Sequence, residues 1–162
     1  MLAEDHVAVR RGLRALLNAN GLFLIVGEAR NGLEAVKLAR TLQPDVVLMD
    51  IAMPLLNGLD ATRQILSADP AARVIILSAY SDDEFIKRAA SLGVAGYLEK
   101  QSVAKVLARA IREVAEGKTF FSPSIARRMP RVQGVPRTRV AVRKGPNGRR
   151  ASGKSGVRLT FN

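Results

Sequence analysis

Short apolar runs alternate with longer amphipathic stretches over residues 1–117. The clearest run covers residues 46–49, follows Pro44 and Asp45, and ends in Asp50. A run of this length, rich in β-branched residues and bounded by breakers, predicts a strand buried on both faces. The same pattern predicts further strands over residues 1–4, 22–29, 74–77 and 95–98.

Helices are predicted between the strands, where apolar residues recur at helical spacing. Asn31 and Ser102 are suited to cap two of them, and Gly21, Gly93 and Gly117 to end three. The predicted ranges are 6–20, 31–42, 58–68, 82–92 and 103–117. Alternating strands and helices predict an α/β fold, in which right-handed crossovers bury a five-stranded parallel sheet between two helical layers.

Composition narrows the class of protein. The chain has 162 residues, 48% of them hydrophobic, which fits one domain with a small appendage. Cysteine is absent, which excludes disulfides and thiolate metal sites. No apolar run approaches the roughly 18 residues of a membrane span, and the acidic start at Glu4 does not fit a signal peptide. We therefore expect a cytoplasmic protein without membrane association.

Charge divides the chain into unequal parts. Residues 127–162 contain 11 of the 26 Lys and Arg residues but no Asp or Glu. We expect a globular domain over 1–117, the start of a linker over 118–126, and a basic tail over 127–162 that is disordered by composition. Weak nucleic-acid binding and an accidental, solvated tail remain open alternatives. The candidate phosphate contacts are Arg127, Arg128, Arg131, Arg137, Arg139, Arg143, Lys144, Arg149 and Arg150.

Polar residues follow four of the predicted strands: Glu4 and Asp5, Asp50, Ser78, and Lys100. In a parallel sheet the carboxyl ends of all strands lie at one edge, so these groups can converge. Three crowded carboxylates repel one another unless a hard cation such as Mg²⁺ neutralises them. A lysine and a hydroxyl opposite them could hold phosphoryl oxygens, with Asp50 as a nucleophile that forms an acyl phosphate.

Together these segments resemble the receiver domain of bacterial two-component response regulators. The resemblance rests on Glu4-Asp5, the stretch Asp-Ile-Ala-Met-Pro-Leu-Leu-Asn-Gly at 50–58, Ser78-Ala79, and Tyr-Leu-Glu-Lys at 97–100. It covers residues 1–126, and residues 4–13 and 120–123 are similar to the NarL/FixJ (LuxR-type) subfamily. It implies a flavodoxin-like (βα)5 three-layer sandwich with strand order 2-1-3-4-5.

The resemblance also implies a role for each site residue. Asp50 would accept a phosphoryl group from a sensor histidine kinase, and Lys100 would pair with that group. Ser78 would then move to bind it while Tyr97 turns inward. The implied Mg²⁺ ligands are Glu4 (through a water), Asp5, Asp50 and the backbone carbonyl of Ala52. Such a domain is not an enzyme, although it assists its own phosphorylation and dephosphorylation.

Some residues are better explained by local structure than by chemistry. His6 has no Cys or second His as a metal partner and is interpreted as a helix-start residue. Gly58 and the Met53-Pro54 pair are interpreted as loop geometry. Two enzyme classes are excluded. Haloacid-dehalogenase-type hydrolases need a second Asp where Ala52 stands, and dinucleotide-binding enzymes need a Gly-rich turn after the first strand.

The chain departs from the family pattern at three places. Only three residues precede Glu4, which indicates a start upstream of Met1 or a weakened fold. Gln101 stands where the family often has proline, which leaves the isomer of the preceding bond undecided. Residues 127–162 are too short for the usual helix-turn-helix domain. The family implies transcription regulation, DNA binding and possible homodimers. The alternatives are a non-specific nucleic-acid-binding protein and a frame-disrupted regulator that only accepts phosphate.

Overall fold

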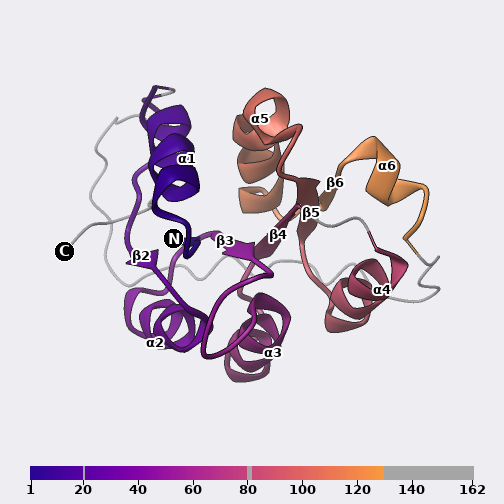
Figure 1. Cartoon of the computed structure of the whole chain (residues 1–162), viewed down its shortest axis with the longest axis horizontal. Coiled ribbons are helices and arrows are strands. Elements are labelled where there is room, and N and C mark those ends of the chain that lie inside the picture. The colour runs from indigo at the N-terminus through magenta and orange to yellow at the C-terminus, as the bar shows by residue number, and fades with distance from the viewer. Residues whose placement is uncertain (20, 80–81, 130–162) are drawn as a thin grey trace, which may run out of the picture.

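The computed structural model describes residues 1–19, 21–79 and 82–129, and the rest of the predicted basic tail lies outside these ranges. Within them, six parallel strands form one sheet in the order β2-β1-β3-β4-β5-β6 (Figure 1). The strands are β1 (Leu2–Ala3), β2 (Glu28–Ala29), β3 (Val47–Asp50), β4 (Val74–Ser78), β5 (Gly96–Glu99) and β6 (Phe120–Phe121). The predicted order of the first five strands, 2-1-3-4-5, is confirmed.

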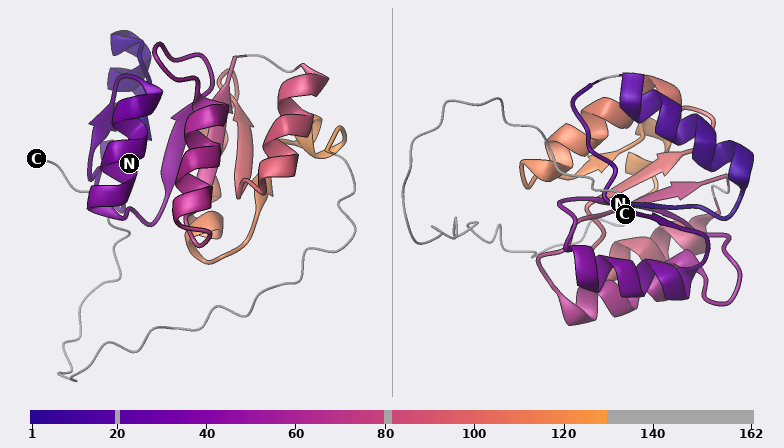
Figure 2. Two further views of the ribbon diagram at one scale, coloured as in Figure 1. Left: turned by 90° about the horizontal axis from the view of Figure 1, so that it is seen from below. Right: turned by 90° about the vertical axis from the view of Figure 1, so that its left-hand side faces the viewer.

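Helices cover both faces of the sheet. Helices α1 and α5 lie on one face and α2, α3 and α4 on the other, giving three layers (Figures 1 and 2). The helices are α1 (Val7–Ala19), α2 (Gly32–Leu42), α3 (Gly58–Ala68), α4 (Asp83–Leu92), α5 (Val103–Ala115) and the short α6 (Pro123–Ala126). The flavodoxin-like fold is therefore confirmed. Among the described helices, none combines the length and apolar character that crossing a membrane requires.

The central strands are buried as their apolar sequence predicts. Every residue of β3 and β4 is buried, including Asp50 and Ser78 at their carboxyl ends. Polar groups are thus brought into the core at one edge of the sheet, because strands buried on both faces leave their ends between the helical layers.

The strand predicted over 22–29 is wrong in extent, since only Glu28–Ala29 pairs with β1. Its partner β1 has just two paired residues, so no longer ladder can form. Leu22 and Leu24 are instead 47% and 43% exposed beside the buried Phe23.

The stretch 118–126, predicted as the start of a linker, adds to the sheet instead. Phe120 and Phe121 pair with Gly96 and Tyr97 of β5, and Ile125 of α6 is completely buried. A two-residue strand carries too little periodicity to be recognised in a sequence. The folded unit therefore extends to α6.

Helix capping follows the predictions with one exception. The side chain of Asn31 accepts a hydrogen bond from the Glu34 amide at 2.8 Å, and Gly93 ends α4 with φ of 75°. Ser102 precedes α5, but its hydroxyl donates to the Glu99 carbonyl at 3.2 Å and caps no amide. The loop after β5 is fixed in this way.

Candidate functional site: an acidic pocket at the carboxyl edge of the sheet

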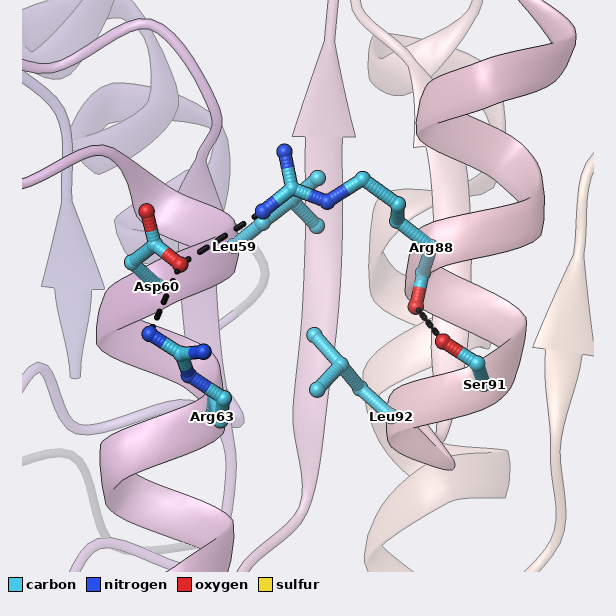
Figure 3. A pocket seen from close by; sticks show the side chains of 6 residues that line it. All are labelled: Leu59, Asp60, Arg63, Arg88, Ser91 and Leu92. Atoms are coloured by element: carbon cyan, nitrogen blue, oxygen red, sulfur yellow. Dashed lines mark hydrogen bonds and ion pairs between the residues drawn. The ribbon is translucent and has the colours of Figure 1, made fainter.

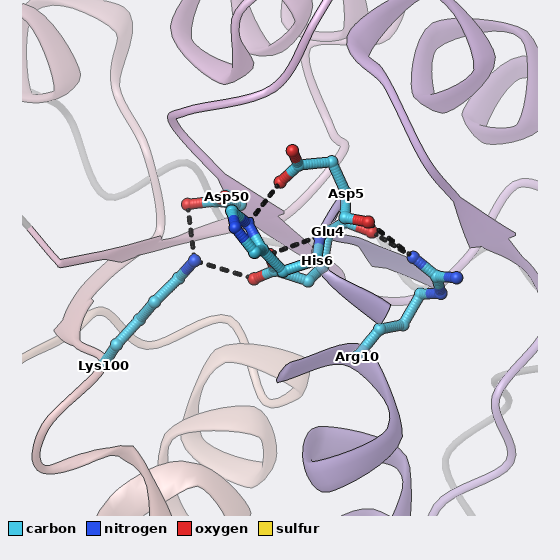
Figure 4. A network of polar contacts seen from close by, with 6 residues as sticks. All are labelled: Glu4, Asp5, His6, Arg10, Asp50 and Lys100. Atoms are coloured by element: carbon cyan, nitrogen blue, oxygen red, sulfur yellow. Dashed lines mark hydrogen bonds and ion pairs between the residues drawn. The ribbon is translucent and has the colours of Figure 1, made fainter. Parts of the chain in front are cut away.

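Two buried carboxylates share one lysine at the carboxyl edge of the sheet. Lys100 Nζ lies 2.7 Å from Glu4 Oε2 and 2.9 Å from Asp50 Oδ1 (Figure 4). Glu4 follows β1, Asp50 ends β3, and Lys100 follows β5, so three strands supply the cluster. The Glu4 side chain is 0% exposed and that of Asp50 3%, whereas that of Lys100 is 20% exposed. The predicted convergence of these three residues is confirmed.

Burial and pairing set the protonation of this cluster. Burial raises the pKa of the Glu4 carboxyl, and the nearby Asp50 charge adds to that rise while the Lys100 hydrogen bond opposes it. Burial alone would lower the pKa of Lys100, but its bonds to Glu4 and Asp50 outweigh this effect and raise it. The lysine therefore stays positively charged between the two acids.

Asp5 belongs to the same edge but has a different neighbour. Its Oδ1 lies 3.2 Å from Nδ1 of His6, and its side chain is 27% exposed. Arg10, a buried residue of α1, donates to the backbone carbonyls of Glu4 at 2.7 Å and Asp5 at 3.2 Å. Sequence reasoning missed Arg10 because its role depends on the turn between β1 and α1.

The remaining predicted site residues lie on adjacent segments. Ser78 and Tyr97 are both buried, and Tyr97 is 0% exposed. Burial raises the pKa of Tyr97, an effect that the bond to the Ser78 side chain opposes. Ala52 is exposed in the loop after β3. Every described peptide bond is trans, including Lys100–Gln101.

The β6–α6 segment is bonded to the strand that leads to Lys100. Ser122 Oγ donates to the Tyr97 carbonyl at 3.3 Å and accepts from the Glu99 amide at 3.3 Å. Ser124 Oγ donates to Glu99 Oε2 at 2.6 Å. Sequence reasoning missed both serines because it placed them in a linker.

Only two of the candidate nucleic-acid residues lie in the described part of the chain. Arg128 Nη2 pairs with Asp83 Oδ1 at 2.7 Å, and Arg127 Nε donates to the Pro123 carbonyl at 3.2 Å. The other candidates lie outside the described residues: Arg131, Arg137, Arg139, Arg143, Lys144, Arg149 and Arg150.

A second ion cluster lines a hollow between α3 and α4 (Figure 3). Arg63 Nη2 and Arg88 Nη2 both point to Asp60 Oδ1, at 3.1 and 3.4 Å. The hollow is lined by Leu59, Asp60, Arg63, Arg88, Ser91 and Leu92. Its ion pairs join residues of α3 and α4 and involve none of Glu4, Asp50 and Lys100, so this cluster is described separately from the acidic pocket.

Comparison with known proteins identifies the family of this fold. Residues 1–112 match the family model described as response regulator receiver domain. The chain belongs to this family. Receiver domains act in signalling rather than as classical enzymes, and the predicted resemblance is confirmed.

Individual relatives of the chain support the same family assignment. The response regulator GacA of Pseudomonas aeruginosa is 40% identical over 130 residues, which cover 80% of this chain and 60% of GacA. Transcriptional regulatory protein YdfI of Bacillus subtilis is 36% identical over 133 residues, which cover 82% of this chain and 62% of YdfI. The chain thus spans about three-fifths of the length of these relatives.

Solved structures place the chain beside the LuxR family. A two-component response regulator of that family from Aurantimonas sp. SI85-9A1 is 36% identical with a TM-score of 0.75, covering 80% of this chain and 92% of that one. A LuxR-family DNA-binding response regulator from Staphylococcus aureus is 30% identical with a TM-score of 0.67, and the match covers 70% of this chain and 95% of that one. The NarL/FixJ (LuxR-type) assignment made from the sequence is confirmed.

Receiver domains generally bind Mg²⁺ in an acidic pocket, and the donors here fit that ion. Glu4, Asp5 and Asp50 bring three carboxylates to an edge where Lys100 pairs with two of them. Hard oxygen donors with water access on one side suit Mg²⁺, which keeps several waters when bound. The partly exposed Asp5 provides that open side.

Proposed function

We propose that Asp50 accepts a phosphoryl group from the phosphohistidine of a sensor histidine kinase, in a Mg²⁺-dependent reaction. The observation that carries this proposal is the position of Lys100 Nζ, 2.9 Å from Asp50 Oδ1 and 2.7 Å from Glu4 Oε2. A carboxylate oxygen of Asp50 would attack phosphorus, the P–N bond would break, and the imidazole would leave with the bonding electrons.

Each neighbouring residue has a part in this step. Lys100 remains charged and would turn from the Asp50 carboxylate to an oxygen of the bound phosphoryl group. Glu4, Asp5, Asp50 and the Ala52 carbonyl would hold Mg²⁺, Glu4 through a water. When bound, this ion neutralises charge on the phosphoryl oxygens. Arg10 would keep the turn carrying Glu4 and Asp5 in place through their carbonyls.

Ser78 and Tyr97 would convert the modification into a change of shape. The Ser78 hydroxyl would bond the phosphoryl group, and the buried position of Tyr97 would be favoured behind it. Tyr97 lies on β5, whose carbonyl and amide groups are bonded to Ser122. Arg128 in turn joins the end of α6 to the start of α4 at Asp83. A shift of β5 would therefore reach both α6 and α4.

The output would be regulation of transcription, with a sensor kinase as the phosphodonor and a homodimer as a possible assembly. These parts of the proposal come from the family, because the chain spans only about three-fifths of relatives such as GacA. DNA contact through the basic residues after Arg128 would be sequence-independent, since phosphate contacts carry no base information.

The decisive experiment treats the protein with acetyl phosphate and Mg²⁺ and measures intact mass. We expect a gain of one phosphoryl group that hydroxylamine removes, as expected of an acyl phosphate. Asp50→Asn should lose this gain completely. The matched control is Asp60→Asn, which removes a carboxylate of the α3–α4 cluster and should be labelled normally. Undiminished labelling of Asp50→Asn would remove Asp50 from the mechanism.

A further inference from the structure

The imidazole of His6 lies at the rim of the acidic pocket. Nδ1 is 3.2 Å from Asp5 Oδ1 and 3.8 Å from Glu4 Oε1, and the side chain is 74% exposed (Figure 4). The sequence predicts only a helix-start residue here, and His6 does accept the α1 hydrogen bond from the Arg10 amide at 2.9 Å. This backbone role leaves the imidazole available for other contacts.

The three side chains are spaced as ligands of one ion. One ligand atom from each of Glu4, Asp5 and His6 can be chosen so that all three lie within 4.8 Å of one another. Two atoms bound to the same metal at about 2.0–2.1 Å are roughly 3 Å apart. The Asp5–His6 contact, a hydrogen bond in this structure, is already close to this length at 3.2 Å, and rotation of the exposed imidazole can shorten the 3.8 Å separation from Glu4 Oε1.

Glu4 can contribute without giving up its lysine. Its Oε2 is taken by Lys100 at 2.7 Å, whereas Oε1 faces His6 and accepts that residue's backbone amide at 3.2 Å. Arg10 holds the backbone carbonyls of Glu4 and Asp5. Outer contacts of this kind orient ligands and strengthen metal binding.

An imidazole changes which ion such a site prefers. Carboxylates and water suit Mg²⁺, whereas an imidazole nitrogen suits Zn²⁺, Cu²⁺ and Ni²⁺. We propose that Glu4, Asp5 and His6 form a site for a borderline divalent transition ion of the Zn²⁺ and Cu²⁺ class. Water would fill the remaining positions on the exposed side.

This site shares Glu4 and Asp5 with the proposed Mg²⁺ site, so the two ions would exclude each other. Micromolar Zn²⁺ would then slow phosphorylation even when Mg²⁺ is abundant. That consequence rests on the proposed function, but binding of the transition ion does not.

The sequence makes the imidazole easy to detect. His6 is the only histidine of the chain, and cysteine is absent. The amine of Met1 is buried and donates to the Val46 carbonyl at 2.8 Å, so it is occupied elsewhere. With tag-free protein and one equivalent of Cu²⁺, electron spin-echo envelope modulation should show the remote nitrogen of a bound imidazole. His6→Asn should lose that signal, and its absence from the unaltered protein would overturn the proposal.

Calorimetric titrations separate a ligand from a positioning residue. We expect His6→Asn to weaken Zn²⁺ binding at least about tenfold and to leave Mg²⁺ binding within about twofold, because only the softer ion favours the imidazole. Asp5→Asn should weaken both ions. Glu84→Gln, which neutralises an exposed carboxylate of α4, is the control and should change neither.

Equal weakening of Zn²⁺ and Mg²⁺ in His6→Asn would show that His6 only positions Asp5, and the proposal would fail. Acetyl phosphate labelling of the same variant with Mg²⁺ alone keeps the two ideas apart. Normal labelling together with lost Zn²⁺ binding supports the transition-ion site. Absent labelling of the unaltered protein would refute the proposed function while leaving the Cu²⁺ and Zn²⁺ results interpretable.

Discussion

The two ion clusters of this domain have opposite compositions and opposite surroundings. At the carboxyl edge, Glu4 and Asp50 share Lys100, and both carboxylates are almost completely buried. Between α3 and α4, Arg63 and Arg88 share Asp60, and the two arginine side chains are 63% and 47% exposed. One cluster has an excess of buried negative charge, and the other has an excess of exposed positive charge.

The difference indicates which of the two clusters is suited to chemistry. An exposed ion pair adds little to the stability of the fold, because water and salt screen both partners and fixing long side chains costs entropy. A buried cluster keeps its strength, but each charge in it needs a partner, since an unpaired buried charge is costly. The acidic pocket therefore has one cation too few, which suits it to receive a metal ion.

The largest expected effect comes from removing the shared cation of the buried cluster. Lys100→Met should lower the free energy of unfolding by about 3 kcal/mol in chelator, because Glu4 and Asp50 then face each other unpaired. Millimolar Mg²⁺ should restore part of the loss through binding to the native state. Urea unfolding with and without Mg²⁺ measures both.

Lys105→Met on the exposed face of α5 is the control, and it should change stability little. The double variant Lys100→Met, Asp50→Asn should recover stability relative to the single one, because only one buried carboxylate remains. A Lys100→Met protein as stable as the unaltered one would contradict the contrast between the clusters.

In protein that begins at Met1, the buried amine of that residue sharpens the comparison. Burial lowers the pKa of a free Met1 amine from 8.0 to about 4, an effect that the Asp45 charge only partly offsets. Between these values the unfolded chain binds the proton and the folded one does not, so stability rises from pH 4 to pH 8 and is level above it. From pH 5 to 8 we expect a gain on the order of 3 kcal/mol from this group.

Urea unfolding across this pH range tests the amine if a second version carries an extra residue before Met1. That version has an amide in place of the amine and can still donate to Val46, so its pH dependence should be flatter. Equal slopes for the two versions would show that the amine is not the titrating group.

The smallest effect is expected at the exposed cluster. Arg88→Ala and Arg63→Ala should each change the free energy of unfolding by no more than about 0.5 kcal/mol, and any change should shrink in high salt. The measurement is urea unfolding at low and high salt. A loss above about 1.5 kcal/mol for either variant would mean that this cluster, too, has a structural role.

The sequence predicts the acidic pocket well because topology brings its parts together. Asp50 follows a strongly apolar run and Lys100 a short strand, and parallel strands place such ends at one edge whatever the loops do. The direction in which His6 points and the carbonyls that Arg10 holds depend on one turn, which no periodicity describes. Their roles could only be found in the structure.

The errors in predicting the fold from the sequence also arise from contacts that local sequence does not describe. Residues 22–29 are apolar enough for a long strand, yet their pairing is limited by the two residues of β1. Phe120 and Phe121 form a strand because β5 offers a free edge, and Ile125 then finds a buried place. In both segments tertiary contacts override local preference.

Gly58 lies so close to the end of β3 that substitutions there would disturb the acidic pocket. A Cβ placed on Gly58 would overlap the backbone carbonyl oxygen of Asp50. Any other residue at this position would have to displace the end of β3, and with it the acid that we propose to be phosphorylated. Substitution of Gly58 is thus expected to reduce the proposed phosphorylation of Asp50, although Gly58 has no side chain of its own. Surveys that rank positions by side-chain reactivity would overlook it.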